Sequence, residues 1–426
     1  MFTTATHAFV QLPVLHALVF ARSPETSMIR KLAVQNFKML RDCAIDLTAL
    51  HLIVGAGVCG KSTALDTLKL VSDVVRLGVS GAMAARGCRF DDLCFTVGRP
   101  IAIAMEIVSP QPGHPCVRYE LELGPDPHAD CGGRVARELL FIVARPQLFV
   151  EPLPVQPSLF GTSPGDSSLL HEKTPRGWRK AVAKSSEGKD YFWDERTDWH
   201  NMFRFGADRS ALGSLPEDTD RFPASIALRD RLRSAVVAVA LGDQALRTPA
   251  PPLTSTLLQP DGLGLPSALR CLQQSDPTRL PTVLELLRRA VPSLRDLKVH
   301  ERPEDRYLVL QAQFEGRDTL VPSSMISSEL LRLIALALLT EQSYGIETPT
   351  LLFDELERGL GPRAIESAFD ILCASRERQF VCATSSPMFV SRALREQVVA
   401  LRRDDNGSAM MLAGEQLPDI ARWFEP

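Results

Sequence analysis

A glycine-rich segment that ends in lysine, serine and threonine points most directly to chemistry. Residues 55–63 read Gly-Ala-Gly-Val-Cys-Gly-Lys-Ser-Thr and match the P-loop pattern G-x-x-x-x-G-K-[ST]. In such a loop, successive backbone N–H groups surround phosphates, and the dipole of the following helix adds to the attraction. We expect Lys61 to neutralise phosphate oxygens and the Ser62 hydroxyl to help hold Mg²⁺. The predicted cofactor-binding residues are Gly55, Ala56, Gly57, Val58, Cys59, Gly60, Lys61, Ser62 and Thr63.

Val58 is the unusual residue of this loop. P-loops of this type carry glycine there, because the turn favours a positive φ, and the left-handed conformation costs an L-residue about 1–2 kcal/mol. Two interpretations remain open: Gly57 takes up the unusual dihedral, or the affinity for nucleotide is reduced. We expect nucleotide binding to survive in either case.

Two consecutive acids form the second candidate feature. Asp354 and Glu355 follow the apolar run 351–353, which predicts a buried strand with Asp354 at its carboxyl end. Open α/β sheets bind ligands at that end of their strands. We expect Asp354 to join Ser62 as a metal-binding residue and Glu355 to act as the general base on an attacking water. The predicted catalytic residues are therefore Lys61, Asp354 and Glu355, with a solvated acidic turn as the structural alternative for the two acids.

Hydrophobic periodicity indicates the elements that must position these residues. Apolar runs at 29–37 and 47–54 predict strands, and the apolar spacing across 62–77 predicts a helix directly after the loop. Alternation within 99–150 predicts antiparallel strands, whereas the chain from about 151 to 225 is expected to be irregular. Further helices are predicted within 226–295, including 283–291, followed by a strand at 308–314. Predicted helices at 330–339 and 363–374 alternate with strands at 351–353, 380–384 and 398–401, which is typical of a parallel α/β sheet.

Composition excludes several classes of protein. Of the 426 residues, 45% are hydrophobic and 23% are charged, as in ordinary soluble proteins, and the net charge of −3 gives no overall basic character. The nine cysteines contain no C-x-x-C pair, which favours free thiols in a reducing compartment over disulfides or zinc. The apolar residues 7–21 are too short to span a membrane and lack a preceding basic segment. We therefore predict a cytoplasmic protein without membrane contact.

Over residues 28–405 the sequence resembles the RecF/SMC-like ABC ATPases, specifically the short "AAA family" predicted ATPases of bacteria. Residues 28–68 resemble the first strands, P-loop and helix of that family. Residues 351–362 (LLFDELERGLGP) are similar to its Walker B strand and D-loop. Residues 326–333 (ISSELLRL) occupy the place of the signature motif, and 379–387 (QFVCATSSP) that of the switch strand. No heptad pattern continues for three turns, so long coiled-coil arms are not expected.

The resemblance implies two heads that enclose two ATP molecules, with the P-loop of one head facing the signature helix of the other. This chain departs from the family pattern in that second half of the site. Glu329 stands where the signature has glycine, Ser385 replaces the switch histidine, and Gly361 stands where the D-loop usually has histidine. A carboxylate at 329 would face a phosphate, which is unfavourable unless a cation intervenes. The resemblance therefore predicts an intact nucleotide-binding half and an altered dimer half.

Four regions follow from these observations. Residues 1–27 are expected to be a disordered or mis-assigned extension, and 28–150 an N-terminal lobe with the P-loop and antiparallel strands. Residues 151–300 are expected to be an irregular and helical insertion, and 301–426 a C-terminal lobe with the signature-like, Walker B and switch segments. The predicted fold class is α/β: a P-loop NTPase of ABC/SMC-head type, with a mixed sheet, an antiparallel β subdomain and a helical insertion.

The leading functional hypothesis is an ATPase head that binds ATP and Mg²⁺, hydrolyses ATP slowly and acts by ATP-dependent homodimerisation. The resemblance suggests DNA repair or phage defence, with DNA as a candidate partner. The alternative is a nucleotide-gated scaffold with little turnover that recruits or restrains an effector encoded nearby, such as a nuclease. A complete ATP-dependent nuclease would need a second acidic module, which the residues after Leu401 do not provide.

Two further segments carry weaker signals. Lys38 and Arg41 follow the first predicted strand, where they could lie near the nucleotide base or in a solvated turn. Residues 193–200 gather acids, aromatic residues and a histidine. A solvent-facing loop with aromatic anchors explains that segment better than a metal site, because no second His/Cys cluster accompanies it.

Overall fold

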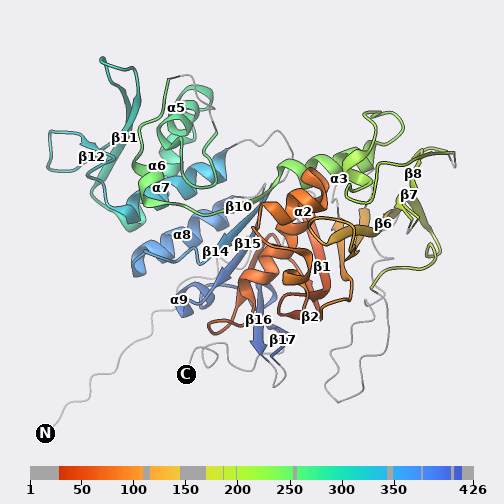
Figure 1. Cartoon of the computed structure of the whole chain (residues 1–426). Coiled ribbons are helices and arrows are strands. Elements are labelled where there is room, and N and C mark those ends of the chain that lie inside the picture. The colour runs from red at the N-terminus through yellow and green to blue at the C-terminus, as the bar shows by residue number, and fades with distance from the viewer. Residues whose placement is uncertain are drawn as a thin grey trace, which may run out of the picture.

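The computed structural model describes residues 28–108, 116–143, 169–185, 187–197, 199–252, 257–342, 349–375, 378–403 and 407–414. The strands of these segments form three sheets, with helices packed between and beside them (Figure 1). The extension predicted for residues 1–27 lies outside the described residues. Among the described helices, none combines the length and the apolar character that a membrane span requires.

An eight-stranded antiparallel sheet, in the order β2-β1-β4-β5-β6-β7-β8-β9, forms one side of the molecule. Alternation within 99–150 correctly predicted its central strands. The prediction of irregular chain from about 151 to 225 is wrong for residues 178–203, because three strands there extend the sheet. Two of these have only four residues, too few for a period to show in the sequence. The strands are β1 (Met28–Phe37), β2 (Leu40–Asp46), β4 (Ile101–Val108), β5 (Cys116–Pro125), β6 (Gly133–Val143), β7 (Trp178–Lys184), β8 (Asp190–Trp193) and β9 (His200–Phe203).

A six-stranded sheet in the order β10-β14-β15-β3-β16-β17 forms the centre. Its first five strands are parallel, as the alternation of strands and helices predicted, and β17 runs antiparallel to β16. A further strand, β17, follows the strand predicted at 398–401. The members are β10 (Val236–Val239), β14 (Thr350–Asp354), β15 (Gln379–Thr384), β3 (Leu50–Val54), β16 (Val398–Arg403) and β17 (Ala409–Ala413).

The central sheet separates two hydrophobic cores. In β3, Ile53 belongs to the core shared with the eight-stranded sheet, whereas Leu52 and Val54 belong to the core on the other side. In β15, Val381 and Phe380 divide in the same way. Because both faces are buried, these strands read as continuous apolar runs in the sequence instead of alternating patterns.

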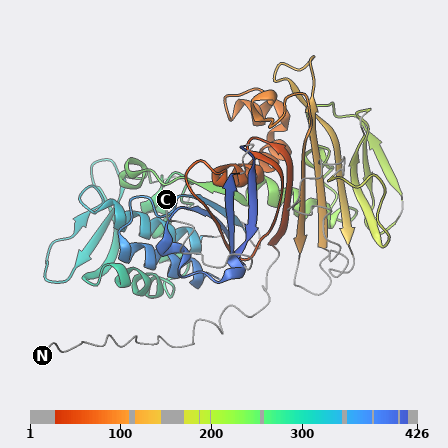
Figure 2. The same cartoon turned by 90° about the horizontal axis from the view of Figure 1, so that it is seen from below.

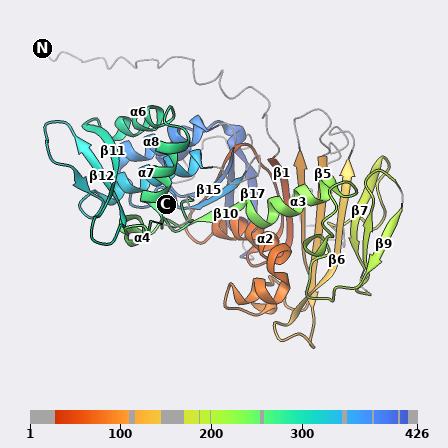
Figure 3. The same ribbon diagram turned by 90° about the horizontal axis from the view of Figure 1, so that it is seen from above.

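The helices divide between these two cores. Figures 2 and 3 show α2 and α3 beside the eight-stranded sheet, and the remaining longer helices with the small sheet at the other end. Ten of the fourteen residues of α7 are buried, which explains the apolar run predicted as a helix at 330–339. The bounds are α2 (Lys61–Ala84), α3 (Pro223–Ser234), α4 (Asp243–Arg247), α5 (Leu265–Ser275), α6 (Leu280–Ala290), α7 (Ser328–Glu341), α8 (Pro362–Ala374) and α9 (Pro387–Val390). The small sheet contains β11 (Leu294–Glu301), β12 (Leu308–Phe314) and β13 (Val321–Pro322).

One fully buried amide connects the two large sheets. Gln379, the first residue of β15, donates from Nε2 to the carbonyl of Ile29 at 2.6 Å and accepts the Ile29 N–H at 3.1 Å. Its Oε1 also accepts the Thr350 hydroxyl at 3.1 Å, and Nε2 approaches the carbonyl of Thr48 at 3.3 Å. The side chain thus joins the starts of β1, β14 and β15 and satisfies polar groups that burial would otherwise leave unpaired.

Helix α2 bends at Gly78, directly after the stretch 62–77 that periodicity predicted to be helical. Gly78 has φ +78° and ψ 178°, a combination reached almost only by glycine. Asp208 completes the bend, since its carbonyl accepts the N–H of Val79 at 2.9 Å and its Oδ1 accepts the N–H of Ser80 at 2.7 Å. A Cβ atom at Gly78 would lie 2.7 Å from Asp208 Oδ2. The bend therefore requires glycine.

We predict that Gly78→Ala lowers the free energy of unfolding by at least about 1–3 kcal/mol, the cost of a strained backbone at a site that also lacks space. The measurement is chemical denaturation followed by circular dichroism. Gly87→Ala is the control, because Gly87 also has a positive φ but has open space around its Cβ position. Equal losses in both variants would contradict the role given to Asp208.

Candidate nucleotide-binding site

The predicted P-loop lies between β3 and α2, in the strand–loop–helix arrangement that the motif requires. Gly55 has φ +156°, and a Cβ atom there would lie 2.5 Å from both Cys59 Sγ and the carbonyl oxygen of Leu401. Gly60 has φ +103° and is the N-terminal cap residue of α2. The two glycines therefore allow a tight loop that leads the chain from the buried strand into the N-terminus of a long helix, where anions are favoured.

Lys61 is the first residue of α2, and its side chain lies inside the loop. The ammonium donates to the carbonyls of Gly55 at 2.8 Å and Ala56 at 3.0 Å, and only 7% of the residue is exposed. The next residue, Ser62, is exposed at the helix N-terminus. A cation and a hydroxyl thus flank the loop's backbone, which is the donor set expected for phosphates and a metal.

Val58 itself takes up the left-handed conformation, with φ +60°, whereas Gly57 has no positive φ. The interpretation in which Gly57 absorbs the unusual dihedral is therefore wrong. The Val58 side chain is 75% exposed, so no packing of the valine offsets the conformational cost. The loop keeps its shape because the residues around it fix the backbone.

The two predicted catalytic acids lie at the same edge of the central sheet as the loop. In the parallel ladder, Asp354 of β14 pairs with Ala383 of β15, and Ala383 pairs with Ile53 of β3. Only β15 separates the acid strand from the loop strand, so their backbones are about 10 Å apart. Both acids are exposed. The register thus places carboxylates beside the loop, at the carboxyl ends of the strands.

Glu355 has a strained backbone, with φ +53°. Its N–H donates to the carbonyl of Ala383 at 2.9 Å, which fixes the turn directly after β14. The side chain is about half exposed and has Arg358 as an ion-pair neighbour at 3.9 Å, a weak surface contact. Strain of this kind in a non-glycine residue is typical of functional sites.

Ser62 and Asp354 offer oxygen ligands that fit Mg²⁺, since a hydroxyl and a carboxylate are hard donors and both side chains are exposed at this sheet edge. Two protein ligands are enough for Mg²⁺ when phosphates and water complete the shell. Elsewhere in the described segments, no group of three or more His, Cys, Asp or Glu side chains could hold a metal ion.

Ser385 directly follows β15, the strand predicted to be the switch strand, and is exposed. Its N–H donates to Glu357 Oε1 at 2.8 Å, and the hydroxyl of the preceding Thr384 donates to the same oxygen at 2.7 Å. Glu357 therefore connects the turn after Asp354 to the end of β15. The sequence reasoning missed Glu357, although its place two residues after Glu355 was a signal.

The signature-like segment begins α7, with Ser327 as its N-terminal cap; the Ser327 hydroxyl accepts the N–H of Leu330 at 3.3 Å. Glu329 has a partner in its own chain: Oε1 accepts the N–H of Gly361, the cap residue of α8, at 2.8 Å. A Cβ atom at Gly361 would lie 3.0 Å from that oxygen. Two of the departures from the family pattern, Glu329 and Gly361, thus contact each other.

Two arginines form hydrogen bonds around the start of α7. Arg332 donates from one nitrogen to the carbonyl of Arg358 at 3.1 Å and pairs with Asp243 of α4 at 3.0 Å. Arg247, at the end of α4, donates to the carbonyls before α7 and to the Ser328 hydroxyl at distances between 2.7 and 3.0 Å. Neither role was predicted, because α4 lies about 80 residues upstream and no local motif identifies it.

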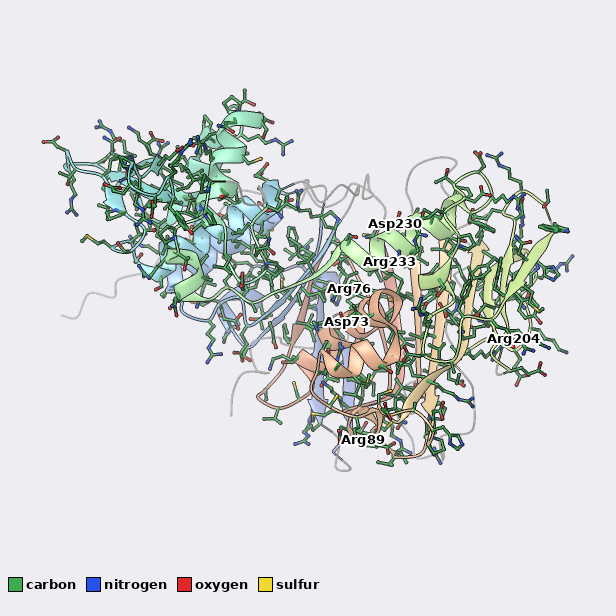
Figure 4. The ribbon with its side chains drawn as sticks, turned by 45° about the horizontal axis from the view of Figure 1, so that its top comes forward. Asp73, Arg76, Arg89, Arg204, Asp230 and Arg233 are labelled. Carbon is green, nitrogen blue, oxygen red and sulfur yellow. The ribbon has the colours of Figure 1, made fainter. Side chains whose placement is uncertain are left out.

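Lys38 does not have a free ammonium, because it pairs with Asp66 of α2 at 2.7 Å. Burial raises the pKa of Asp66, but hydrogen bonds from Arg86 and Lys38 outweigh it and hold that pKa below its ordinary value. Arg86 also pairs with Asp73, which Figure 4 labels beside Arg76 on α2. Lys38 thus fastens the β1–β2 turn to α2, and a contact of Lys38 or the exposed Arg41 with a nucleotide base stays a prediction.

The acid-rich segment 193–200 has structural partners. Glu195 accepts the N–H groups of Ala224 and Ser225 at 2.8 Å and so caps the start of α3. Trp193 and His200 pair across β8 and β9 with ring centroids 5.4 Å apart. Asp198 lies outside the described residues. Trp193 ends β8 and His200 begins β9, so the ends of this segment lie in strands and not in the predicted solvent-facing loop.

Comparison with solved structures identifies the fold. An SMC head bound to the C-winged helix domain of ScpA matches 90% of this chain and 96% of its own, with 17% identity and a TM-score of 0.50. The chain has the P-loop NTPase fold of an SMC head. A second SMC head, with an extended coiled coil and bound to the C-terminal domain of ScpA derived from Pyrococcus furiosus, is similar over 91% and 97% of the two chains, with 16% identity and a TM-score of 0.47. No family model matches the sequence, and no curated protein does.

We predict that Val58→Gly raises the free energy of unfolding of this head by up to about 1 kcal/mol. It removes the cost of a left-handed valine, which glycine's greater unfolded-state entropy partly offsets. Because the valine is exposed, no core contact is lost. Thermal unfolding measures the effect, with Val97→Gly, another exposed valine, as the control without a positive φ. A lower melting temperature for Val58→Gly than for Val97→Gly would contradict the strain at Val58.

We predict that Glu329→Ala lowers the free energy of unfolding by about 1–2 kcal/mol, because the Gly361 N–H loses its acceptor at the start of α8. Glu329→Gln keeps an acceptor oxygen at the same position and is expected to lose less than half of that amount. Urea denaturation of both variants provides the measurement. If alanine and glutamine were equally harmless, the contact would contribute nothing in solution.

Proposed function

We propose that this chain is an ATPase head that binds ATP with Mg²⁺, hydrolyses it slowly, and pairs with a second copy around the bound nucleotides. The observation that carries the proposal is the register of β14, β15 and β3, which puts Asp354 and Glu355 at the sheet edge where the P-loop begins. In the proposed reaction, the P-loop N–H groups and Lys61 bind phosphates, Ser62 and Asp354 hold the metal, and Glu355 accepts a proton from water. When bound, Mg²⁺ would neutralise negative charge on the phosphates.

A second candidate is a nucleotide-gated scaffold with little turnover. It is favoured by the altered dimer half, because Glu329 is engaged within its own chain and Ser385 cannot provide the positive charge of a histidine. In that case, a bound nucleotide would control the recruitment of an effector protein. The SMC head solved with a domain of ScpA supports a protein partner by analogy. Cytoplasmic localisation and a role in DNA repair or phage defence are further parts of this proposal.

Nucleotide binding and turnover distinguish the two candidates. We expect Lys61→Ala to weaken the binding of a fluorescent ATP analogue at least about tenfold, because a charge-assisted contact worth about 1.5–3 kcal/mol is lost. Glu355→Gln should retain binding but slow hydrolysis by about 10²–10⁴-fold and increase the ATP-dependent dimer seen by light scattering. Lys298→Ala and Glu285→Gln, exposed residues of β11 and α6, are the matched controls.

Three outcomes have distinct meanings. Unchanged ATP binding in Lys61→Ala would overturn the whole proposal. ATP binding without turnover, unaffected by Glu355→Gln, would leave the scaffold as the function. Turnover without any ATP-dependent change in mass would separate hydrolysis from dimerisation.

A further inference from the structure

The eight-stranded sheet has one face that no described helix covers at its outer end. Figure 3 shows α3 lying across one face of the sheet, and Figure 2, from the opposite side, shows the strands in front of it. Strand alternation divides the side chains accordingly: Val182 and Phe192 point into the main core, whereas Ala183 and Tyr191 belong to a separate small cluster. This second surface, formed by β6 to β9, is called the outer face below.

The outer face carries a row of aromatic rings. Trp178 packs against Phe141 with centroids 5.6 Å apart, and the rings of Tyr191 and Trp193 stack at 5.8 Å with an angle of 29°. His200 continues the row, 5.4 Å from Trp193. The two tryptophans and Tyr191 are only half-buried. Trp178 already has ring partners, since His171 also packs against it with centroids 5.2 Å apart. The exposed part of Trp193 is the surface on which another planar group can stack.

Cations accompany these rings. The Lys180 ammonium lies 5.5 Å from the Trp193 ring centroid, a cation–π arrangement, and no carboxylate of the described residues lies within 4 Å of it. Burial, and then the positive charge of Arg137, lower the pKa of Lys180. The exposed Arg179 is held by the carbonyls of Asp194 and Thr197, and Figure 4 shows Arg204 at the outer edge of the sheet. Among the described residues, neither Arg179 nor Lys180 has an ion pair with a carboxylate.

A cavity of about 290 Å³ opens between these groups. The described residues that line it are Trp178, Arg179, Lys180, Trp193 and Thr197. Their side chains are two indoles, two cations and one hydroxyl. Asp194, which follows Trp193 in the sequence, accepts the N–H groups of Arg196 and Thr197 with its Oδ1. The cavity therefore suits a ligand that combines a flat ring with negative charge.

We propose that the outer face binds single-stranded nucleic acid, with a base stacked on Trp193 in this cavity and the backbone phosphates near Lys180 and Arg179. Unpaired bases expose the flat faces that aromatic side chains stack on, whereas bases in a duplex are already stacked on each other. Alternating aromatic and basic groups are the chemistry of such surfaces. The proposal does not rest on ATP binding, because the outer face and the P-loop lie on different sheets.

Tryptophan fluorescence tests this directly, because three of the four tryptophans of the chain lie on or next to the outer face. We expect an oligothymidylate of about 20 nucleotides, longer than common site sizes, to quench the emission of the full chain at about 50 mM salt. Trp193→Ala should weaken binding at least about tenfold, and Lys180→Gln about threefold or more. Trp193→Phe keeps an aromatic ring, which protects folding, and should weaken oligonucleotide binding less than Trp193→Ala does. Lys298→Gln, an exposed lysine of β11, makes the same charge change and should bind like the unaltered chain.

The possible outcomes separate the proposal from its alternatives. Binding of the oligonucleotide that is equal in Trp193→Ala, Lys180→Gln and Lys298→Gln would overturn it, as would absence of binding at low salt. A duplex that competes as well as the single strand would also overturn the stacking mode. An RNA of the same length tests which sugar is preferred. Lys61→Ala should bind the oligonucleotide normally, so a failure of this proposal is distinguishable from a failure of ATP binding.

Discussion

The parallel pairing of β3 with β15, and of β15 with β14, is the interaction on which the site depends. It joins segments that lie about 300 residues apart, and no local contact could bring the P-loop and the two acids together. Both faces of this sheet are buried, so a slip of one residue in β15 would move Val381 and Phe380 into the wrong cores. Burial therefore fixes the register, and the register fixes the place of Asp354.

Backbone strain accumulates on both sides of β15. Val58 has φ +60° and Glu355 has φ +53°, and both residues follow strands that end at the same sheet edge. Such conformations persist only where neighbouring groups determine them. Here the tight packing at Gly55 and the hydrogen bond from Glu355 to Ala383 have that effect. The stability of the central sheet thus offsets the backbone strain at Val58 in the P-loop and at Glu355 after β14.

The sequence predicted the features that depend on neighbours along the chain. The P-loop, the helix after it and the strands around 351–353 and 380–384 have local periods or motifs, and the structure contains them. Strands β8 and β9 were missed because four residues show no period. The contact of Glu329 with Gly361, and the roles of Glu357 and Arg247, depend on side chains meeting across 28 to 81 positions. Contacts between residues so far apart in the sequence produce no periodic pattern from which they could be predicted.

The turn 355–361 connects the two acids after β14 with the start of α7. Glu357 connects it to the end of β15, while Glu329 and Arg332 connect it to the start of α7. All three bonds involve a carboxylate or a guanidinium, the stronger class of hydrogen bond. A movement of the acids relative to α7 must break these bonds or carry α7 with it. Glu329 and Gly361 therefore form one structural unit: the carboxylate accepts the N–H of Gly361, and the glycine leaves room for it.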